Sequence, residues 1–403
     1  MAKEKGKRKR KFQKPDLLLA ALAFIILAFG LVMVLSAGAR FSYQQGNTVY
    51  HLFLLQLMWA FFGLAAALLA FMIPFNKWRR ICGVALVAVG GLLILAHVPG
   101  IGVQSNDAAR WVNIFGLQLQ PSELAKLAIV IFLAHNFDQY PVRRFRDAWW
   151  PCLLVLGITV LVLTEDLGSG VIMLATLTAM LFQTGLSLRY FVVGIPTALC
   201  LGWMYISTHP RIQGWLDPWN NFTDIGHQTA LSQYVLAMGG LFGIGMGGNA
   251  GARALPESYN DMIFSVIGQE LGFFGAVVFL LGLALFIMRC YYVSYRCQDH
   301  FGRLLGFGVS SLIAIQSGIN ICAAIGVMPI TGVTLPLVSY GGTSLLISLF
   351  EVGILLNISR GMTKEVKVRA SRISKSGVSD KNATPNDEQG SPPSIQGSGT
   401  ETI

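Results

Sequence analysis

Residues 17–36 read LLLAALAFIILAFGLVMVLS, an apolar stretch without a charged or amide side chain. An α-helix rises about 1.5 Å per residue, so a stretch of this length crosses the roughly 30 Å hydrocarbon core of a bilayer. It is longer than the roughly 7–15 residue core of a signal peptide, and further apolar runs follow it. We therefore expect it to remain in the protein as the first transmembrane helix.

The composition of the whole chain agrees with a membrane protein. Of 403 residues, 54% are hydrophobic and 12% are charged, whereas soluble domains carry about 25% charged residues. The formal net charge is +10, but eight basic residues crowd into residues 3–14 and most others lie in short links between apolar runs. Such charges orient a membrane protein and hold anionic membrane lipids. No basic face of a folded domain is evident, so a nucleic-acid partner is not expected.

Ten apolar runs predict an all-α polytopic membrane protein with about ten transmembrane helices. The predicted spans are 17–37, 51–73, 81–97, 121–137, 149–165, 168–186, 189–207, 271–290, 305–327 and 341–358. They form one transmembrane domain over residues 17–361, after a basic cytoplasmic segment at 1–16. Residues 362–403 are rich in Ser, Gly, Asn, Pro and charge, and we expect a disordered cytoplasmic tail there.

The distribution of basic residues predicts that both termini lie in the cytoplasm. With that orientation, 25 Lys and Arg residues fall in inner segments and four in outer loops. Merging the spans at 149–165 and 168–186 into one would place the basic link at 289–304 on the outer side. Ten separate spans therefore fit the distribution of basic residues better. The longest outer loop, residues 208–270, lies between helices 7 and 8, and loops of that length usually have a function. Within it, residues 230–238 are expected to form a short helix at the membrane interface.

Cysteine and histidine usage identifies no metal or disulfide site. None of the six cysteines falls in a predicted outer loop, so no disulfide framework is expected. The six histidines are scattered and show no metal-ligand spacing.

Charged residues inside a membrane are costly and often functional. Lys126 lies within a predicted span, three residues after Glu123 and just after the helix start at Gln120-Pro121. The two charges can pair on one helix face, either as a structural ion pair or as part of a site.

Two aspartates and one glycine-rich segment each allow two interpretations. Asp166 is either the N-cap of the sixth span, which local evidence favours, or a carboxylate that faces a cavity with Lys126. Asp261 is either an N-cap or a base placed just above the bilayer. The glycines at 239–248 indicate close backbone packing or a nest of amides for a lipid-linked phosphate, and not a nucleotide site, because no strand precedes them.

Several motifs, in order and at family-like spacing, resemble the SEDS (shape, elongation, division, sporulation) family, the FtsW/RodA/SpoVE group. They are 109–111 (ARW), 120–126 (QPSELAK), 217–219 (DPW), 255–257 (LPE), 260–261 (ND), 269–272 (QELG), 328–332 (MPITG) and 335–342 (LPLVSYGG). The chain departs from the usual family sequence at Glu165, Asn260 and Thr343. It retains the family's two aspartates, at Asp166 and Asp261.

The resemblance implies a peptidoglycan glycosyltransferase of the cytoplasmic membrane. Such enzymes polymerise lipid II at the outer face, together with a class B penicillin-binding transpeptidase and other divisome or elongasome proteins. The long tail and the sequence at 332–336 favour the division (FtsW) or sporulation (SpoVE) type. By resemblance, the catalytic aspartate is Asp261. The substrate-binding positions of the outer cavity are Arg110, Gln120, Glu123, Lys126 and Asp166.

The implied chemistry is displacement at a sugar C1 that carries a diphosphate-lipid leaving group. Asp261 would accept the proton of the attacking hydroxyl, while Arg110 and Lys126 would stabilise the departing diphosphate. No cofactor is identifiable; a divalent cation is compatible with the chemistry, although no ligand set singles one out. Two other function classes remain open: a flippase that moves lipid II across the membrane, and a non-catalytic scaffold for the transpeptidase.

Overall fold

The computed structural model describes residues 14–96, 98, 102–105, 108–114, 117–207, 210–219, 226–248 and 255–362. The expected basic segment 1–16, apart from its last three residues, lies outside the described residues. The expected tail does too, apart from Met362, which makes an isolated β-bridge with Cys297.

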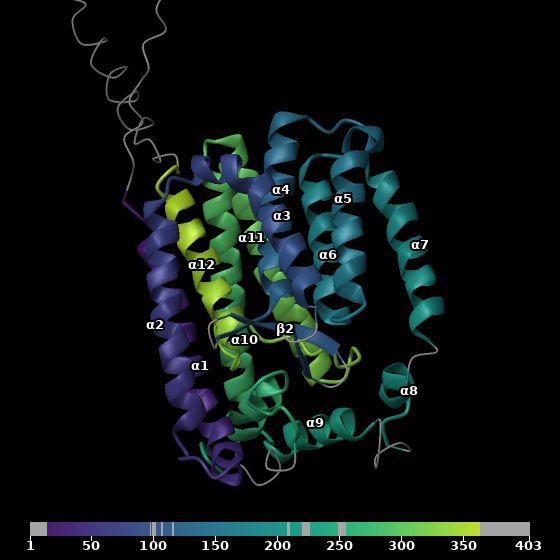
Figure 1. Ribbon diagram of the computed structural model, residues 1–403. Helices are drawn as coiled ribbons and strands as arrows, with labels where there is room; N and C mark the ends of the chain where they lie inside the picture. Colours follow the sequence, from purple (N-terminus) through teal and green to yellow (C-terminus); the bar gives the residue numbers. More distant parts are fainter. Residues whose placement is uncertain are drawn as a thin grey trace, which may run out of the picture. The chain divides into compact units, whose positions relative to one another are not determined.

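In the described part of the chain the fold is mainly helical (Figure 1). The elements are α1 (Leu17–Gln44), α2 (His51–Met72), η1 (Phe75–Lys77), α3 (Trp78–Ala96), β1 (Gly102–Ser105), β2 (Ala108–Ile114), β3 (Leu117–Leu119), α4 (Pro121–Gln139), α5 (Phe145–Leu163), α6 (Leu167–Gln183), α7 (Leu188–Ile206), α8 (Pro210–Leu216), α9 (His227–Met238), α10 (Ile263–Arg296), α11 (His300–Ala324) and α12 (Gly342–Ser359).

Each of the ten predicted spans coincides with a helix. Among the described residues, seven helices are long and apolar enough to cross a membrane, and α6 is a shorter apolar helix. The multi-pass membrane architecture is therefore confirmed, while the count of ten crossings and their sidedness stay predictions. Helix α4 is less apolar because it carries charged residues, and 14 of its 19 residues are buried. A helix surrounded by protein rather than lipid can hold such residues.

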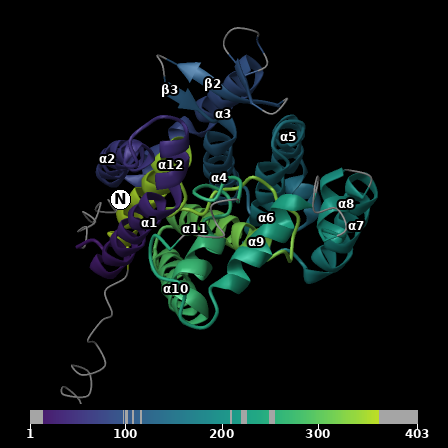
Figure 2. The ribbon, with the colours of Figure 1, turned by 90° about the horizontal axis from the view of Figure 1, so that it is seen from below.

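The middle of the bundle is formed by α4 and α11. Seen from below, they lie between α1, α2 and α12 on one side and α5, α6 and α7 on the other (Figure 2). Small residues bring helices close together, as membrane packing requires. A Cβ on Gly353 of α12 would lie 2.3 Å from the carbonyl oxygen of Ala67 in α2. Because α4 and α11 lie in the middle of the bundle, their polar residues face protein rather than lipid.

The start of α1 and the end of α12 lie at the same end of the bundle. Asp16 caps α1, and its backbone N–H donates to Ser359 Oγ at 3.0 Å. Its carboxylate also pairs with Arg289 near the end of α10, with Nη2 and Oδ2 2.7 Å apart. An even number of crossings places both termini on one side, so this contact agrees with the predicted parity.

A small antiparallel sheet, in the order β1-β2-β3, replaces part of the outer loop predicted at 98–120. Strand β2 pairs with β3 through Val112 and Leu119, and β3 leads directly to the start of α4. The predicted helical fold class is confirmed, but the three short strands of this segment were not predicted. Strands of three to seven residues give too short an alternation to stand out from a loop.

The segment 208–270, predicted to be an outer loop, contains α8, α9 and the first turns of α10. The short helix expected at 230–238 is confirmed as α9. It packs on α10 and α11, where Ser232 Oγ lies 2.6 Å from Ser265 Oγ and donates to the carbonyl oxygen of Ala324 at 2.7 Å. All six cysteines are free.

Candidate active site

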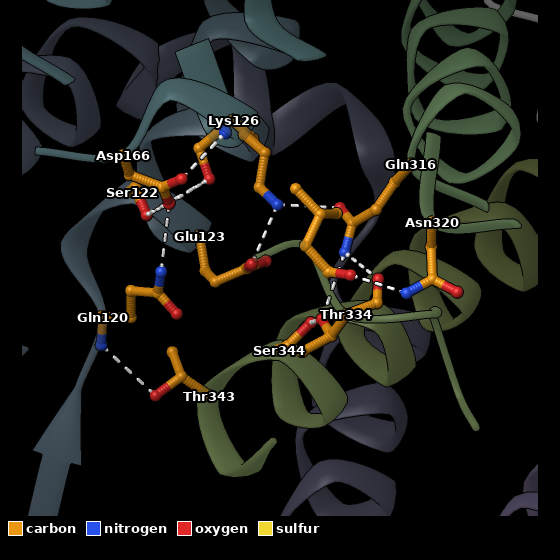
Figure 3. A network of polar contacts seen from close by, with 12 residues as sticks. Gln120, Ser122, Glu123, Lys126, Asp166, Gln316, Asn320, Thr334, Thr343 and Ser344 are labelled. Atoms are coloured by element: carbon orange, nitrogen blue, oxygen red, sulfur yellow. Dashed lines mark hydrogen bonds and ion pairs between the residues drawn. The ribbon is translucent and has the colours of Figure 1, made fainter. Parts of the chain in front are cut away.

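The start of α4 supplies a buried ion pair. Pro121 occupies the first turn, where its missing N–H costs nothing, and Gln120 is the N-cap residue. Lys126 Nζ donates to Glu123 Oε1 at 2.8 Å and to Gln316 Oε1 of α11 at 2.7 Å (Figure 3). Only 2% of Lys126 and 6% of Glu123 is exposed. The predicted pairing is present, and it has a third member that the sequence did not indicate.

Asp166 both caps α6 and faces α4 (Figure 3). Its Oδ1 accepts from the backbone N–H of Ser169 at 3.1 Å, so the N-cap interpretation is confirmed. Its Oδ2 accepts from Gln120 Nε2 and from Ser122 Oγ, both at 3.2 Å, and from Ser169 Oγ at 2.6 Å. The structure thus brings the predicted residues Gln120 and Asp166 into direct contact beside the Lys126 pair.

The segment 328–341 lies at this end of the bundle and is hydrogen-bonded to α2 and α12. Gln56 Nε2 donates to the carbonyl oxygen of Ser339 at 2.9 Å, and Thr334 Oγ1 lies 2.7 Å from Ser344 Oγ. Where α12 begins, Thr343 Oγ1 accepts from the backbone N–H of Gln120 at 3.3 Å. This last bond holds the start of α4 against the start of α12.

Asp261 lies in the turn before α10 and is 9% exposed. The N-cap interpretation is wrong, because Met262 occupies the N-cap position and no side chain makes a capping bond there. Two residues earlier, the backbone carbonyl oxygen of Tyr259 accepts a hydrogen bond from the backbone N–H of Tyr340 at 2.9 Å. Burial raises the pKa of Tyr259, with smaller contributions from Glu257, Tyr340 and Asp261. The phenol beside Asp261 therefore stays protonated at neutral pH.

The glycine-rich segment 239–248 packs against a break in α10. Gly272 interrupts the helix with φ 69° and ψ −173°. The carbonyl oxygens left by the break accept from the segment: Gln269 from Ile244 N–H at 3.0 Å, and Glu270 from Gly245 N–H at 3.1 Å. Beyond the break, Phe273 N–H donates back to the Gly240 carbonyl at 2.9 Å. Irregular backbone at membrane depth needs such protein partners.

These contacts favour the close-packing interpretation of the glycines. The backbone N–H groups of Ile244 and Gly245 are engaged by α10, so they are not available to a phosphate. A Cβ on Gly239 would lie 2.1 Å from the carbonyl oxygen of Gly268, and one on Gly243 would lie 2.1 Å from that of Glu270. Only glycine permits this approach.

Arg110 lies on β2, but its side chain is outside the described residues, so its role remains a prediction. The described residues contain no group of three or more His, Cys, Asp or Glu side chains that could hold a metal ion.

Three buried polar residues near Lys126 were missed from the sequence. Gln316 and Asn320 lie in α11, and Glu351, which is 4% exposed, lies in α12. Glu351 interacts electrostatically with Lys126, favourably, and with Glu123, unfavourably. The available signal was a carboxylate or amide inside an apolar span, the same signal that singled out Lys126.

The family model described as a cell cycle protein, FtsW/RodA/SpoVE, matches residues 16–364. A probable peptidoglycan glycosyltransferase FtsW from Geobacter sp. (strain M18) is 34% identical over 362 residues, covering 88% of this chain and 99% of that protein. The stage V sporulation protein E of Bacillus subtilis (strain 168) is 34% identical over 355 residues, covering 86% and 97%.

Solved structures give the same result. A chain of a peptidoglycan synthase complex that coordinates polymerization and crosslinking superposes with a TM-score of 0.75 at 30% identity, covering 87% of this chain and 99% of that one. The rod shape determining protein RodA of Thermus thermophilus superposes with a TM-score of 0.66 at 29% identity, covering 87% and 98%. The motifs, the fold and these relatives agree: the chain belongs to the FtsW/RodA/SpoVE family of cell cycle proteins.

Proposed function

We propose that the chain is a peptidoglycan glycosyltransferase that polymerises lipid II at the outer face of the cytoplasmic membrane, for cell division or cell shape. The observation that carries the proposal is the buried Lys126–Glu123 pair, joined through α11 to the turn that carries Asp261. The peptidoglycan glycosyltransferase relatives that match along almost their whole length support it.

In the proposed reaction a sugar hydroxyl attacks C1 of a second sugar. The new bond joins the hydroxyl oxygen to C1, and the bond from C1 to the diphosphate oxygen breaks. Asp261 takes the hydroxyl proton, because an alcohol is a weak nucleophile; general-base help of this kind contributes about 10²–10⁴-fold. The substrate is already activated, so the reaction needs no further source of energy.

The diphosphate that departs gains negative charge, and Lys126 is suited to stabilise it. An ammonium has three N–H donors, and within the described residues Lys126 uses two of them, on Glu123 and Gln316. We propose that the third donor binds a phosphate oxygen of the substrate. A charge held in a buried, preorganised place acts more strongly than one in water. Arg110, from β2, is proposed to share this role.

We also propose that the chain works with a class B penicillin-binding transpeptidase within the division or elongation machinery. The similarity to a chain of a peptidoglycan synthase complex supports this partner. The proposed placement of the site on the outer face rests on the basic-residue distribution and on the loop at 208–270 that leads to Asp261.

The test is a polymerisation assay with purified protein, its transpeptidase partner and labelled lipid II. Asp261→Asn keeps the shape of the side chain but cannot accept a proton at neutral pH, so glycan strands should disappear while the melting temperature is unchanged. Glu257→Gln is the matched control: it makes the same charge change at an exposed position in the same turn, and activity should persist.

Two results would support the other function classes. If Asp261→Asn keeps normal polymerisation, the catalytic assignment is wrong. If the wild-type protein forms no glycan but moves labelled lipid II across vesicles, the chain is a flippase, and the buried charges serve a polar path. If it does neither yet still binds the transpeptidase, it is a scaffold.

A further inference from the structure

Two amide side chains one turn apart on α11 contact both halves of the proposed site. Gln316 is 4% exposed and Asn320 is 1% exposed. Residues four apart lie on one helix face. Gln316 Oε1 accepts from Lys126 Nζ at 2.7 Å, and Asn320 Nδ2 donates to the backbone carbonyl of Asp261 at 2.8 Å. One helix face thus reaches the lysine proposed for the leaving group and the residue proposed as the base.

The same two amides also hold consecutive residues of the segment 328–341. Gln316 Nε2 donates to the carbonyl oxygen of Thr334 at 3.1 Å, and Asn320 Nδ2 donates to that of Val333 at 2.7 Å (Figure 3). The contacts form a continuous path from Lys126 through Gln316, the segment 328–341 and Asn320 to Asp261.

The chemistry of the partners fixes the orientation of both amides. A carbonyl oxygen only accepts, so Asn320 must direct its NH₂ group at Asp261 and Val333. An ammonium only donates, so Gln316 must direct its oxygen at Lys126. Turning either amide over would bring acceptor against acceptor or donor against donor. Both side chains are therefore held in one position in a buried place, where a lost hydrogen bond costs most.

We propose that Gln316 and Asn320 are positioning residues that set the separation of Asp261 from Lys126 during glycosyl transfer. The inference rests on the proposed function, in which these two groups serve the attacking hydroxyl and the leaving diphosphate. Neither amide is a catalytic residue; each acts through the group that it holds. A misplacement of about 1 Å in such an arrangement costs about 10²-fold in rate.

The two positions should fail in different ways. Asn320→Leu removes both donated bonds at constant shape and releases the turn of Asp261, while Lys126 keeps Glu123 and Gln316. Here kcat should fall at least about tenfold with little change in KM for the lipid-linked donor. Gln316→Met releases Lys126 instead, so KM for the donor should rise at least about tenfold with a smaller effect on kcat.

Asn320→Ser covers the case in which Asn320→Leu does not fold. Its hydroxyl can donate to one of the two carbonyls and leaves room for water, so kcat should lie between the wild-type and Asn320→Leu values. Ser317→Ala is the matched control: Ser317 is buried on the same helix, its Oγ has no hydrogen-bond partner within the described residues, and kcat and KM should stay at wild-type values.

The experiment measures kcat and KM per folded molecule for these variants and Asp261→Asn, in the complex with the transpeptidase. A fall in kcat for Asn320→Leu and a rise in KM for Gln316→Met, together with an inactive Asp261→Asn, support the inference. If Asp261→Asn is inactive but both amide variants keep wild-type constants, or lose activity only in proportion to folded protein, the positioning role is wrong and the proposed function stands. If Asp261→Asn is active, both the proposed base and the inference fail.

Discussion

The backbones of Gly243 and Gly272 lie in direct contact, so that a Cβ on Gly272 would be 2.2 Å from the nitrogen of Gly243. Gly243 belongs to the segment after α9, and Gly272 is the break in α10. Both have positive φ angles, 82° and 69°. This contact joins the predicted outer loop to α10, eleven residues after the proposed base, Asp261.

Gly272→Ala should strongly destabilise the protein. The new Cβ would meet backbone atoms of Gly243 that cannot move aside, and the positive φ disfavours alanine, so we expect a loss of about 3 kcal/mol or more. Gly282→Ala on the same helix has nothing within 4 Å of its Cβ and should be tolerated. The measurement is the fraction of monodisperse protein after heating. Equal behaviour of the two variants would contradict the role of the contact.

Lys126→Met should abolish polymerisation and also lower the melting temperature, because Glu123 would be left buried without its cation. Adding Glu123→Gln removes that stranded charge, so the double variant should regain stability without regaining activity. The comparison needs both a melting curve and a polymerisation assay for each variant. Activity restored in the double variant would mean that Lys126 and Glu123 form only a structural pair.

Glu351→Gln should leave the melting temperature unchanged or raise it. Glu351 is buried, and Glu123 lies close enough to repel it. An amide of the same size removes the desolvation cost of a charge. Glu123→Gln is the comparison: it removes the carboxylate partner of Lys126 and should destabilise by about 3 kcal/mol. A larger loss for Glu351→Gln than for Glu123→Gln would refute this.

Labelling from outside the cell should reach a cysteine in the loop at 208–270 and miss one between α4 and α5. Asp217, in the first segment, and Tyr140, in the second, are both exposed. In a background without the native cysteines, an impermeant maleimide should label Asp217→Cys and spare Tyr140→Cys. The reverse pattern would invert the predicted topology.

The positions of the helices follow from the sequence alone. A membrane span is a local property, a run of apolar residues long enough for the bilayer, so ten runs predicted ten helices. Their ends were predicted less well: α1 and α10 extend well beyond the predicted spans 17–37 and 271–290. The pairing of Glu123 with Lys126 is also local, because three residues bring them to one helix face. The family motifs are likewise legible in order along the chain.

Only the tertiary structure decided which distant groups complete the site. Gln316 contacts Lys126, which lies 190 residues away in the sequence, and Asn320 contacts Asp261, which lies 59 residues away. A pattern within one helix shows which face is polar, but not which helix packs against that face. Likewise, the glycines at 239–248 allowed a phosphate site or close packing, and the break at Gly272 decided between them. The unsatisfied carbonyls there lie on another segment, and only the folded bundle brings the loop amides to them.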